Sequence, residues 1–262
     1  EIANRLAFLF TDAPPDAELS AAVASGSLAT PEGRRLQAER LLALPQARVV
    51  VTQFVREWVG AGSKDLSQRV TPEVALAFDE ELRLLIEEAF FETGEGGLAK
   101  LVQGDTTYVN QSLAEHYGFA DAPADDATWE SVTRPAGMQA GMLSAGAVAA
   151  AHASDAETSV ILRGRFVREG LLCDELGSPP PGAIDQNPVL PAHATVRQKI
   201  EARSEIELCA GCHVRMDLIG IGMEDIDNVG RLRDGYDDGN ALDIDGLIIG
   251  LGEDDGATFA GT

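Results

Sequence analysis

Apolar residues recur at helical spacing through the first half of the chain. The first such group comprises Ile2, Leu6, Leu9 and Phe10, and it ends before Pro14-Pro15-Asp16. Residues about three to four positions apart share one side of an α-helix, so these side chains are expected to pack together. A longer stripe with the same spacing covers residues 74–90 and predicts an amphipathic helix whose apolar side faces the core.

Two tripeptides mark the predicted beginnings of helices. Thr30-Pro31-Glu32 and Thr71-Pro72-Glu73 each place a hydroxyl before a proline and an acid after it. The hydroxyl can accept a hydrogen bond from a free amide of the first turn, and proline is tolerated at the first helical position. The helix dipole favours the acid at this end. Helices are therefore predicted to begin at Pro31 and Pro72.

The second half of the chain alternates helical segments with loops. Residues 121–135, rich in Ala, Asp and Pro, are expected to form a linker or surface loop. Small residues dominate 138–151, an amphipathic helix is predicted at 159–172, and the proline-rich stretch 179–191 is expected to be extended. The sequence thus predicts a mostly α protein, with a helical domain at 1–120 and a second helical domain at 136–262 that carries proline-rich and glycine/aspartate-rich loops.

Composition and charge narrow the class of partner. The chain has 262 residues, of which 45% are hydrophobic, so it can bury a substantial core. Its 43 acidic residues outnumber its 20 Lys and Arg, which gives a formal net charge of −23. Such a charge disfavours nucleic acid and anionic membranes as partners and favours a basic protein, although it can also act only to keep a surface soluble. No stretch approaches the roughly 18 apolar residues that a membrane-spanning helix needs.

The segment Cys209-Ala-Gly-Cys212-His213 carries the most specific chemical signal. Two thiols three positions apart, followed directly by an imidazole, are typical of a c-type haem attachment site. The thiols would form thioether bonds to one porphyrin edge, and His213 would bind the iron.

Two other functions of a Cys-x-x-Cys pair fit less well. A zinc site would need a second pair of ligands, which the sequence lacks, and a thioredoxin-like pair normally follows a strand, whereas this segment is predicted to be helical. The remaining cysteine, Cys173, is expected to be a small buried residue at the end of a helix.

The haem motif also predicts a compartment, because thiols are joined to haem outside the cytoplasm. The protein is therefore expected in the periplasm, on the cell surface or outside the cell. The sequence begins at Glu1 without a methionine, and we expect that a leader or an upstream region preceded it.

Beyond the motif, the chain resembles the planctomycete-type exported cytochrome c family, whose multidomain members are largely of unknown function. The resemblance lies in Ile2-Ala3-Asn4-Arg5-Leu6, in Leu113-Ala114-Glu115-His116-Tyr117-Gly118, in Thr158-Ser159 with Arg163-Gly164, and in the haem motif continued by Met216-Asp217. Val160 and Leu218 depart from it, since the family usually has proline there. The resemblance implies redox or electron-transfer work, with further domains before and after this region.

The sixth iron ligand is open at this point. It is expected from a distant segment, and the candidates are His116, Met138, Met142, His152 and His193. His152 is preferred because it follows the small-residue stretch of the expected haem domain, and Met142 is second. Met216 and Met223 are expected in the haem wall or the core, since Met216 lies only three residues after His213. A histidine would hold the reduction potential low and a methionine would raise it.

Charged residues suggest two further contacts. Arg163, with Arg165 and Arg168, could pair with haem propionates, since a guanidinium can bind both oxygens of a carboxylate; alternatively, these residues form an exposed helix face. Asp237, Asp243 and Asp245 lie in a glycine-rich stretch and are weak calcium candidates, because their spacing does not match an EF-hand and such turns are often only solvated.

Three functional classes follow from these features. The leading one is an electron carrier with one covalent haem, passing electrons to a protein partner or a neighbouring haem. The second is a haem enzyme with an open distal site, peroxidase-like or another oxidoreductase. The third is a structural or assembly module that haem stabilises. No catalytic residue is assigned, because no phosphate-binding loop or nucleophilic triad is recognisable in the sequence.

Overall fold

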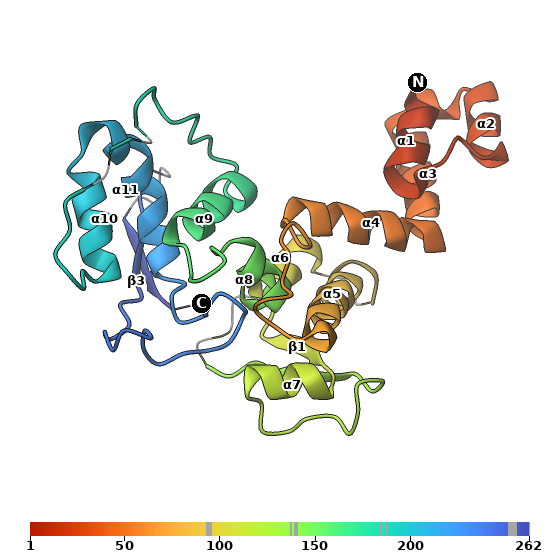
Figure 1. Ribbon diagram of the computed structural model, residues 1–262. Helices are drawn as coiled ribbons and strands as arrows, with labels where there is room; N and C mark the ends of the chain where they lie inside the picture. Colours follow the sequence, from red (N-terminus) through yellow and green to blue (C-terminus); the bar gives the residue numbers. More distant parts are fainter. Residues whose placement is uncertain are drawn as a thin grey trace.

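The protein is mostly α-helical, as its sequence predicts, and the helices lie in three neighbouring groups along an elongated molecule (Figure 1). The computed structural model describes residues 1–92, 96–136, 138, 141–183, 185–186, 188–250 and 256–261. Its α-helices are α1 (Ile2–Thr11), α2 (Ala17–Ala24), α3 (Pro31–Leu42), α4 (Pro45–Trp58), α5 (Pro72–Glu87), α6 (Gly97–Gln103), α7 (Gln111–Tyr117), α8 (Gly146–Ala151), α9 (Val160–Arg165), α10 (Val196–Ser204) and α11 (Glu207–Ile221). Its strands are β1 (Thr106–Val109), β2 (Glu130–Thr133), β3 (Asp245–Ile248) and β4 (Ala257–Ala260).

Both predicted helix starts are confirmed. α3 begins at Pro31, and the Thr30 hydroxyl accepts a hydrogen bond of 3.0 Å from the amide of Gly33. α5 begins at Pro72, and the Thr71 hydroxyl accepts one of 3.4 Å from the amide of Val74. In both cases the cap satisfies an amide that has no partner within the helix.

The first three helices form a small cluster at one end of the molecule, beyond α4 in Figure 1. Their shared core consists of Ala3, Ala7, Leu19, Ala22, Leu28 and Leu41. Three of these six residues are alanines and three are leucines.

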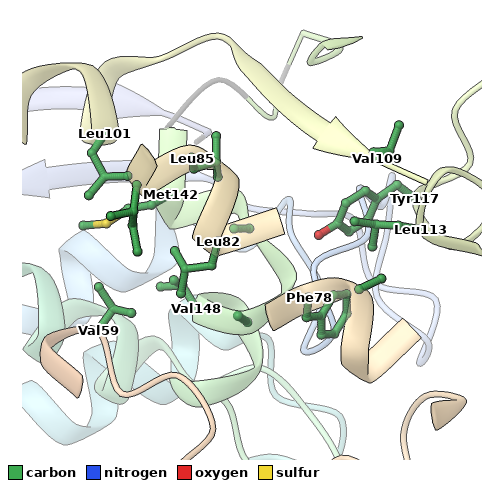
Figure 2. Close-up of a cluster of buried hydrophobic side chains, with 14 of the residues drawn as sticks. Val59, Phe78, Leu82, Leu85, Leu101, Val109, Leu113, Tyr117, Met142 and Val148 are labelled. Atoms are coloured by element: carbon green, nitrogen blue, oxygen red, sulfur yellow. The ribbon is translucent and has the colours of Figure 1, made fainter. Parts of the chain in front are cut away.

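The largest core is built around α5 and crosses the division expected at 121–135. Figure 2 shows Phe78, Leu82 and Leu85 of α5 with residues from both sides of that segment. Tyr117 comes from before it, and Met142 and Val148 come from after it. Strand β2, within the expected linker, pairs antiparallel with β1 and places Thr133 opposite Thr106. The hydrophobic core is therefore not divided at this segment.

A buried polar network holds this core together. Glu81 of α5 is fully buried and accepts hydrogen bonds from the Tyr117 hydroxyl at 2.6 Å and from Arg134 at 3.2 Å. The Tyr117 oxygen in turn accepts a bond of 2.8 Å from the Gly146 amide at the start of α8. Because an unpaired buried charge would be costly, these contacts fix α5, α7 and α8 relative to one another.

α9 and α11 cross with their backbones almost in contact. A Cβ on Gly164 of α9 would lie 1.8 Å from the Met216 carbonyl oxygen, and one on Gly220 of α11 would lie 1.9 Å from the Val160 carbonyl oxygen. Only glycine permits this approach at either position. α10 packs beside α11, and the paired strands β3 and β4 lie near its C-terminal part, so the Cys-x-x-Cys-His motif lies in a group of helices of its own (Figure 1).

In the described part of the chain, no helix combines the length and apolar character needed to cross a membrane. This agrees with the sequence, in which no sufficiently long apolar stretch occurs.

Candidate functional site

The Cys-x-x-Cys-His motif occupies the first two turns of α11. Cys209, Cys212 and His213 are at positions i, i+3 and i+4, which share one face of a helix. Cys209 is buried, and Cys212 is partly exposed with its Sγ 3.4 Å from the carbonyl oxygen of Leu176. The side chain of His213 is 19% exposed.

This face of α11 borders a pocket of about 290 Å³. α9 contributes Ile161, Leu162 and Arg165; the segment before α10 contributes Leu176, Pro179 and Pro180; α11 adds Leu208 and Met216. Most of these side chains are apolar, and two of them are prolines. The thiols and the imidazole therefore lie beside a mainly hydrophobic space, as a porphyrin requires.

A hydrogen bond from His213 to the Asp217 carboxylate fixes the orientation of the imidazole. The Nδ1 atom of His213 lies 3.0 and 3.1 Å from the two carboxylate oxygens of Asp217, one turn further along α11. Asp217 is fully buried and also accepts a hydrogen bond of 3.0 Å from Nε of Arg203. The carboxylate accepts, so Nδ1 of His213 carries the proton and Nε2 is left with its lone pair. A histidine held in this way is prepared to bind a metal through Nε2.

Arg163 lies away from this pocket, although the sequence suggested it as a partner for haem propionates. Its side chain is buried, and its guanidinium donates to the carbonyl oxygens of Met223 and Ile226 at 2.6 Å and of Asp227 at 2.7 Å. Burial lowers the pKa of Arg163, and the nearby Glu224 carboxylate partly opposes this effect. Arg165 of the same helix is the arginine that lines the pocket.

His152, the preferred sixth ligand, has a different environment from the haem motif. Its Nε2 lies 3.0 Å from the Val59 carbonyl oxygen, and its ring stacks on Phe166 with the centroids 4.2 Å apart. Burial lowers the pKa of His152 to about 4. The contacts join the end of α8 to the end of α4, and His152 is not among the residues that line the pocket beside His213.

Met142, the second choice, is fully buried in the core around α5 (Figure 2). The other candidates are also placed elsewhere. His116 bonds to the Val229 carbonyl at 2.9 Å, Met138 packs against Ala149 and Ile226, and His193 is exposed. Met216 lines the pocket on the same helix as His213, and Met223 is buried beside His152 and Phe166. Among the described residues that line the pocket, therefore, Met216 is the single His or Met besides His213.

The calcium candidates do not form a ligand cluster. Asp243 makes two bonds of 2.6 Å to Arg197, and this pairing lowers the pKa of Asp243. Arg197 also donates to the backbone carbonyl of Asp245, and Asp237 lines a separate polar pocket. No group of three or more His, Cys, Asp or Glu side chains suited to a metal ion occurs among the residues that the structure describes.

Cys173 is exposed, so the expectation that it is buried is wrong. It does follow the end of a helical segment, because a π-helical turn, η4 (Phe166–Leu171), continues α9 up to this point. The backbone of Cys173 is left-handed, with φ 53°.

Sequence reasoning missed Asp217 as the partner of His213. The available signal was its position four residues after the histidine on a predicted helix, which is the spacing of a side-chain pair. Arg203 gave no comparable signal, because it lies on another helix and reaches Asp217 only through the packing of α10 against α11.

Two family models match the chain. PSD4, a protein of unknown function (DUF1592), matches residues 1–119, and PSCyt3, a protein of unknown function (DUF1588), matches residues 139–236. No curated protein and no solved structure matches. By name these are planctomycete cytochrome c-type families, which supports the resemblance seen in the sequence. The second matched range contains Cys209, Cys212, His213 and Asp217.

Proposed function

We propose that this chain is an exported c-type cytochrome that carries one covalent haem and transfers electrons to a protein partner or a neighbouring haem. The observation that carries the proposal is the arrangement on α11. Cys209, Cys212 and His213 share one face beside an apolar pocket, and Asp217 holds His213 with Nε2 available. Cys209 and Cys212 would form the thioether bonds, and His213 would bind the iron.

The residues around the motif suit such a cofactor. Haem supplies reversible one-electron chemistry when it is bound. Ile161 and Leu162 exclude water from one side of the pocket, and the prolines of 176–183 limit access from another. Arg165 is the best-placed partner for a propionate, because its guanidinium can bind two carboxylate oxygens at once.

The same proposal places the protein in the periplasm, on the cell surface or outside the cell, where haem is joined to thiols. The family names support a cytochrome, and the acidic composition fits a basic redox partner.

Covalent attachment provides the direct test. The chain would be exported in a host with a haem-ligation system, and haem would be detected by peroxidase staining after denaturing electrophoresis and by the pyridine haemochrome spectrum. The unsubstituted chain should retain haem after denaturation. Cys209→Ser and Cys212→Ser should each lose one thioether bond, and the double variant should lose all covalent haem.

Cys173→Ser is the matched control, because it removes a cysteine that is exposed and outside the pocket. It should retain the full amount of haem. Absence of covalent haem from the unsubstituted chain under these conditions would refute the proposal.

One observation favours a second function, that of a haem enzyme with an open distal site. Among the described residues that line the pocket, Met216 is the one sulfur or imidazole candidate other than the motif itself, and it is on the helix of His213. Carbon monoxide and cyanide separate the two functions. Rapid binding of both with a high-spin spectrum would favour the enzyme, whereas a low-spin spectrum with slow binding would favour the electron carrier.

A further inference from the structure

We infer that Asp217 and Arg203 are positioning residues that set the reduction potential of the haem through His213, Asp217 lowering it and Arg203 limiting that effect. The inference rests on the proposed function and extends it from the haem ligands to a second helix, α10.

His213, Asp217 and Arg203 are connected by direct side-chain contacts. The Asp217 carboxylate lies 3.0 Å from Nδ1 of His213 on one side and 2.9 Å from a terminal nitrogen of Arg203 on the other. None of the Asp217 side chain is exposed to solvent, whereas the Arg203 side chain is 20% exposed and borders a second, polar pocket. The charge nearest to His213 is thus a buried carboxylate whose counter-ion is at the edge of solvent.

A buried carboxylate at Nδ1 changes how strongly Nε2 of the imidazole donates electrons to iron. It draws the Nδ1 proton toward itself, so Nε2 becomes a stronger electron donor. A stronger donor stabilises ferric iron more than ferrous iron, and the reduction potential falls. The low dielectric around Asp217 increases this effect, because no water competes for its oxygens.

Arg203 acts in the opposite direction. Its guanidinium donates a hydrogen bond from Nε to Oδ2 of Asp217 and places a terminal nitrogen 2.9 Å from the same oxygen, so it offsets part of the negative charge that His213 would otherwise experience. Removing Arg203 should therefore leave Asp217 to draw more strongly on the Nδ1 proton.

The test is the midpoint potential of the haem-loaded full chain, measured by spectroelectrochemical titration at pH 8 for two variants. Asp217→Asn keeps the shape and a hydrogen-bonding group but removes the charge. It should raise the equilibrium constant for reduction by about tenfold, which for a one-electron couple is about 59 mV. Arg203→Met should shift the potential in the opposite direction, and Arg203→Lys, which keeps the charge, should restore most of the original value.

Opposite shifts distinguish this role from a structural one. If the variants only loosened the haem site, water would enter in both cases and lower both potentials, because water stabilises the more highly charged ferric state. A rise in Asp217→Asn cannot come from such loosening. No rise in Asp217→Asn, or a rise in Arg203→Met, would overturn the inference.

α10 also supplies a matched control. Arg197 of that helix pairs with Asp243 through two bonds of 2.6 Å, and neither residue lines the pocket beside His213. Arg197→Met and Asp243→Asn remove the same charges from a more exposed ion pair of the same kind and should leave the potential nearly unchanged. If the unsubstituted chain binds no haem, the proposed function fails and these potentials cannot be measured. If it binds haem and the variants do not shift the potential as described, only the present inference fails.

Discussion

His152 shows how a single buried imidazole can link stability to pH. Its contacts with Val59 and Phe166 place it between α4 and η4, and burial lowers its pKa to about 4. In the unfolded chain the pKa returns to about 6.5. The unfolded state therefore takes up the proton first as the pH falls, so the folded state loses stability between about pH 6.5 and pH 4.

We predict a loss of about 3 kcal/mol from this one group at pH 4 relative to pH 8. His152→Gln keeps a donor for the Val59 carbonyl but does not titrate, so it should lack that part of the pH dependence. Denaturant unfolding of both proteins from pH 8 to pH 4 measures the difference. Parallel curves would contradict the prediction.

The sequence predicted the three motif residues but not their surroundings, and the reason lies in helix geometry. Arg163 and Arg165 are two positions apart, which turns their side chains about 200° from each other on α9. Arg163 is therefore buried while Arg165 borders the pocket, and composition does not show which of the two would do so. His152 was preferred as the sixth ligand from its position in the sequence, whereas its contacts depend on Val59, which is far away in the chain.

At the scale of elements, the crossing of α9 and α11 determines the shape of the pocket beside His213. Gly164 and Gly220 let the two backbones approach, and the helices that they join carry most of the pocket wall. We predict that Gly164→Ala and Gly220→Ala each force the helices apart. Since the added Cβ would meet backbone rather than a mobile side chain, each should destabilise the protein by about 1–3 kcal/mol and reduce haem incorporation.

Gly211 is the control for this prediction. It lies inside the haem motif on α11, yet a Cβ there would have no described atom within 4 Å. Gly211→Ala should be neutral or stabilising by up to about 1 kcal/mol, because alanine is the better helix former. Thermal unfolding and the haem-to-protein absorbance ratio measure both effects. Equal behaviour of the three variants would show that the close crossing is not needed.

Helix starts were predictable because they depend on neighbours in the sequence. Thr30 and Thr71 cap amides three residues away, and the fold adds nothing to that interaction. The pairing of β1 with β2 was not predictable, because it brings Thr106 opposite Thr133 across α7 and a surface loop. The close crossing also depends on a distant contact, so the sequence shows two glycines but not that they meet a backbone.

At the scale of the whole molecule, sequence families and packing divide the chain differently. The two family matches leave residues 120–138 between them, and this gap contains the linker expected at 121–135. Around α5, however, residues from both matched ranges share one core, and Arg134 from the gap pairs with the buried Glu81. Composition indicates which segment of a chain is polar and rich in proline. It does not indicate whether the parts before and after that segment share a core, because those contacts join residues that are distant in sequence.

If the proposed haem is bound, the net charge of −23 should control how fast it exchanges electrons. Glu175 and Glu207 are exposed and directly precede Leu176 and Leu208, which line the pocket. A cationic reagent such as hexaammineruthenium should therefore react faster at low salt than the anion ferricyanide, once the rates are corrected for the difference in driving force. Raising the ionic strength should slow the first and speed the second, since the screening length falls from about 30 Å at 0.01 M to about 8 Å at 0.15 M.

The position of the charges, and not only their sum, should matter for this rate. Glu175→Gln with Glu207→Gln removes two charges at the pocket, whereas Glu73→Gln with Asp121→Asn removes two exposed charges from α5 and the segment after α7. Stopped-flow measurement with the cationic reagent should show a several-fold slower reaction for the first pair and a small change for the second. Equal effects of the two pairs would mean that the electron leaves elsewhere or that only net charge acts. A basic partner would meet the same local field, so the pair that slows the reagent identifies the face at which such a partner would dock.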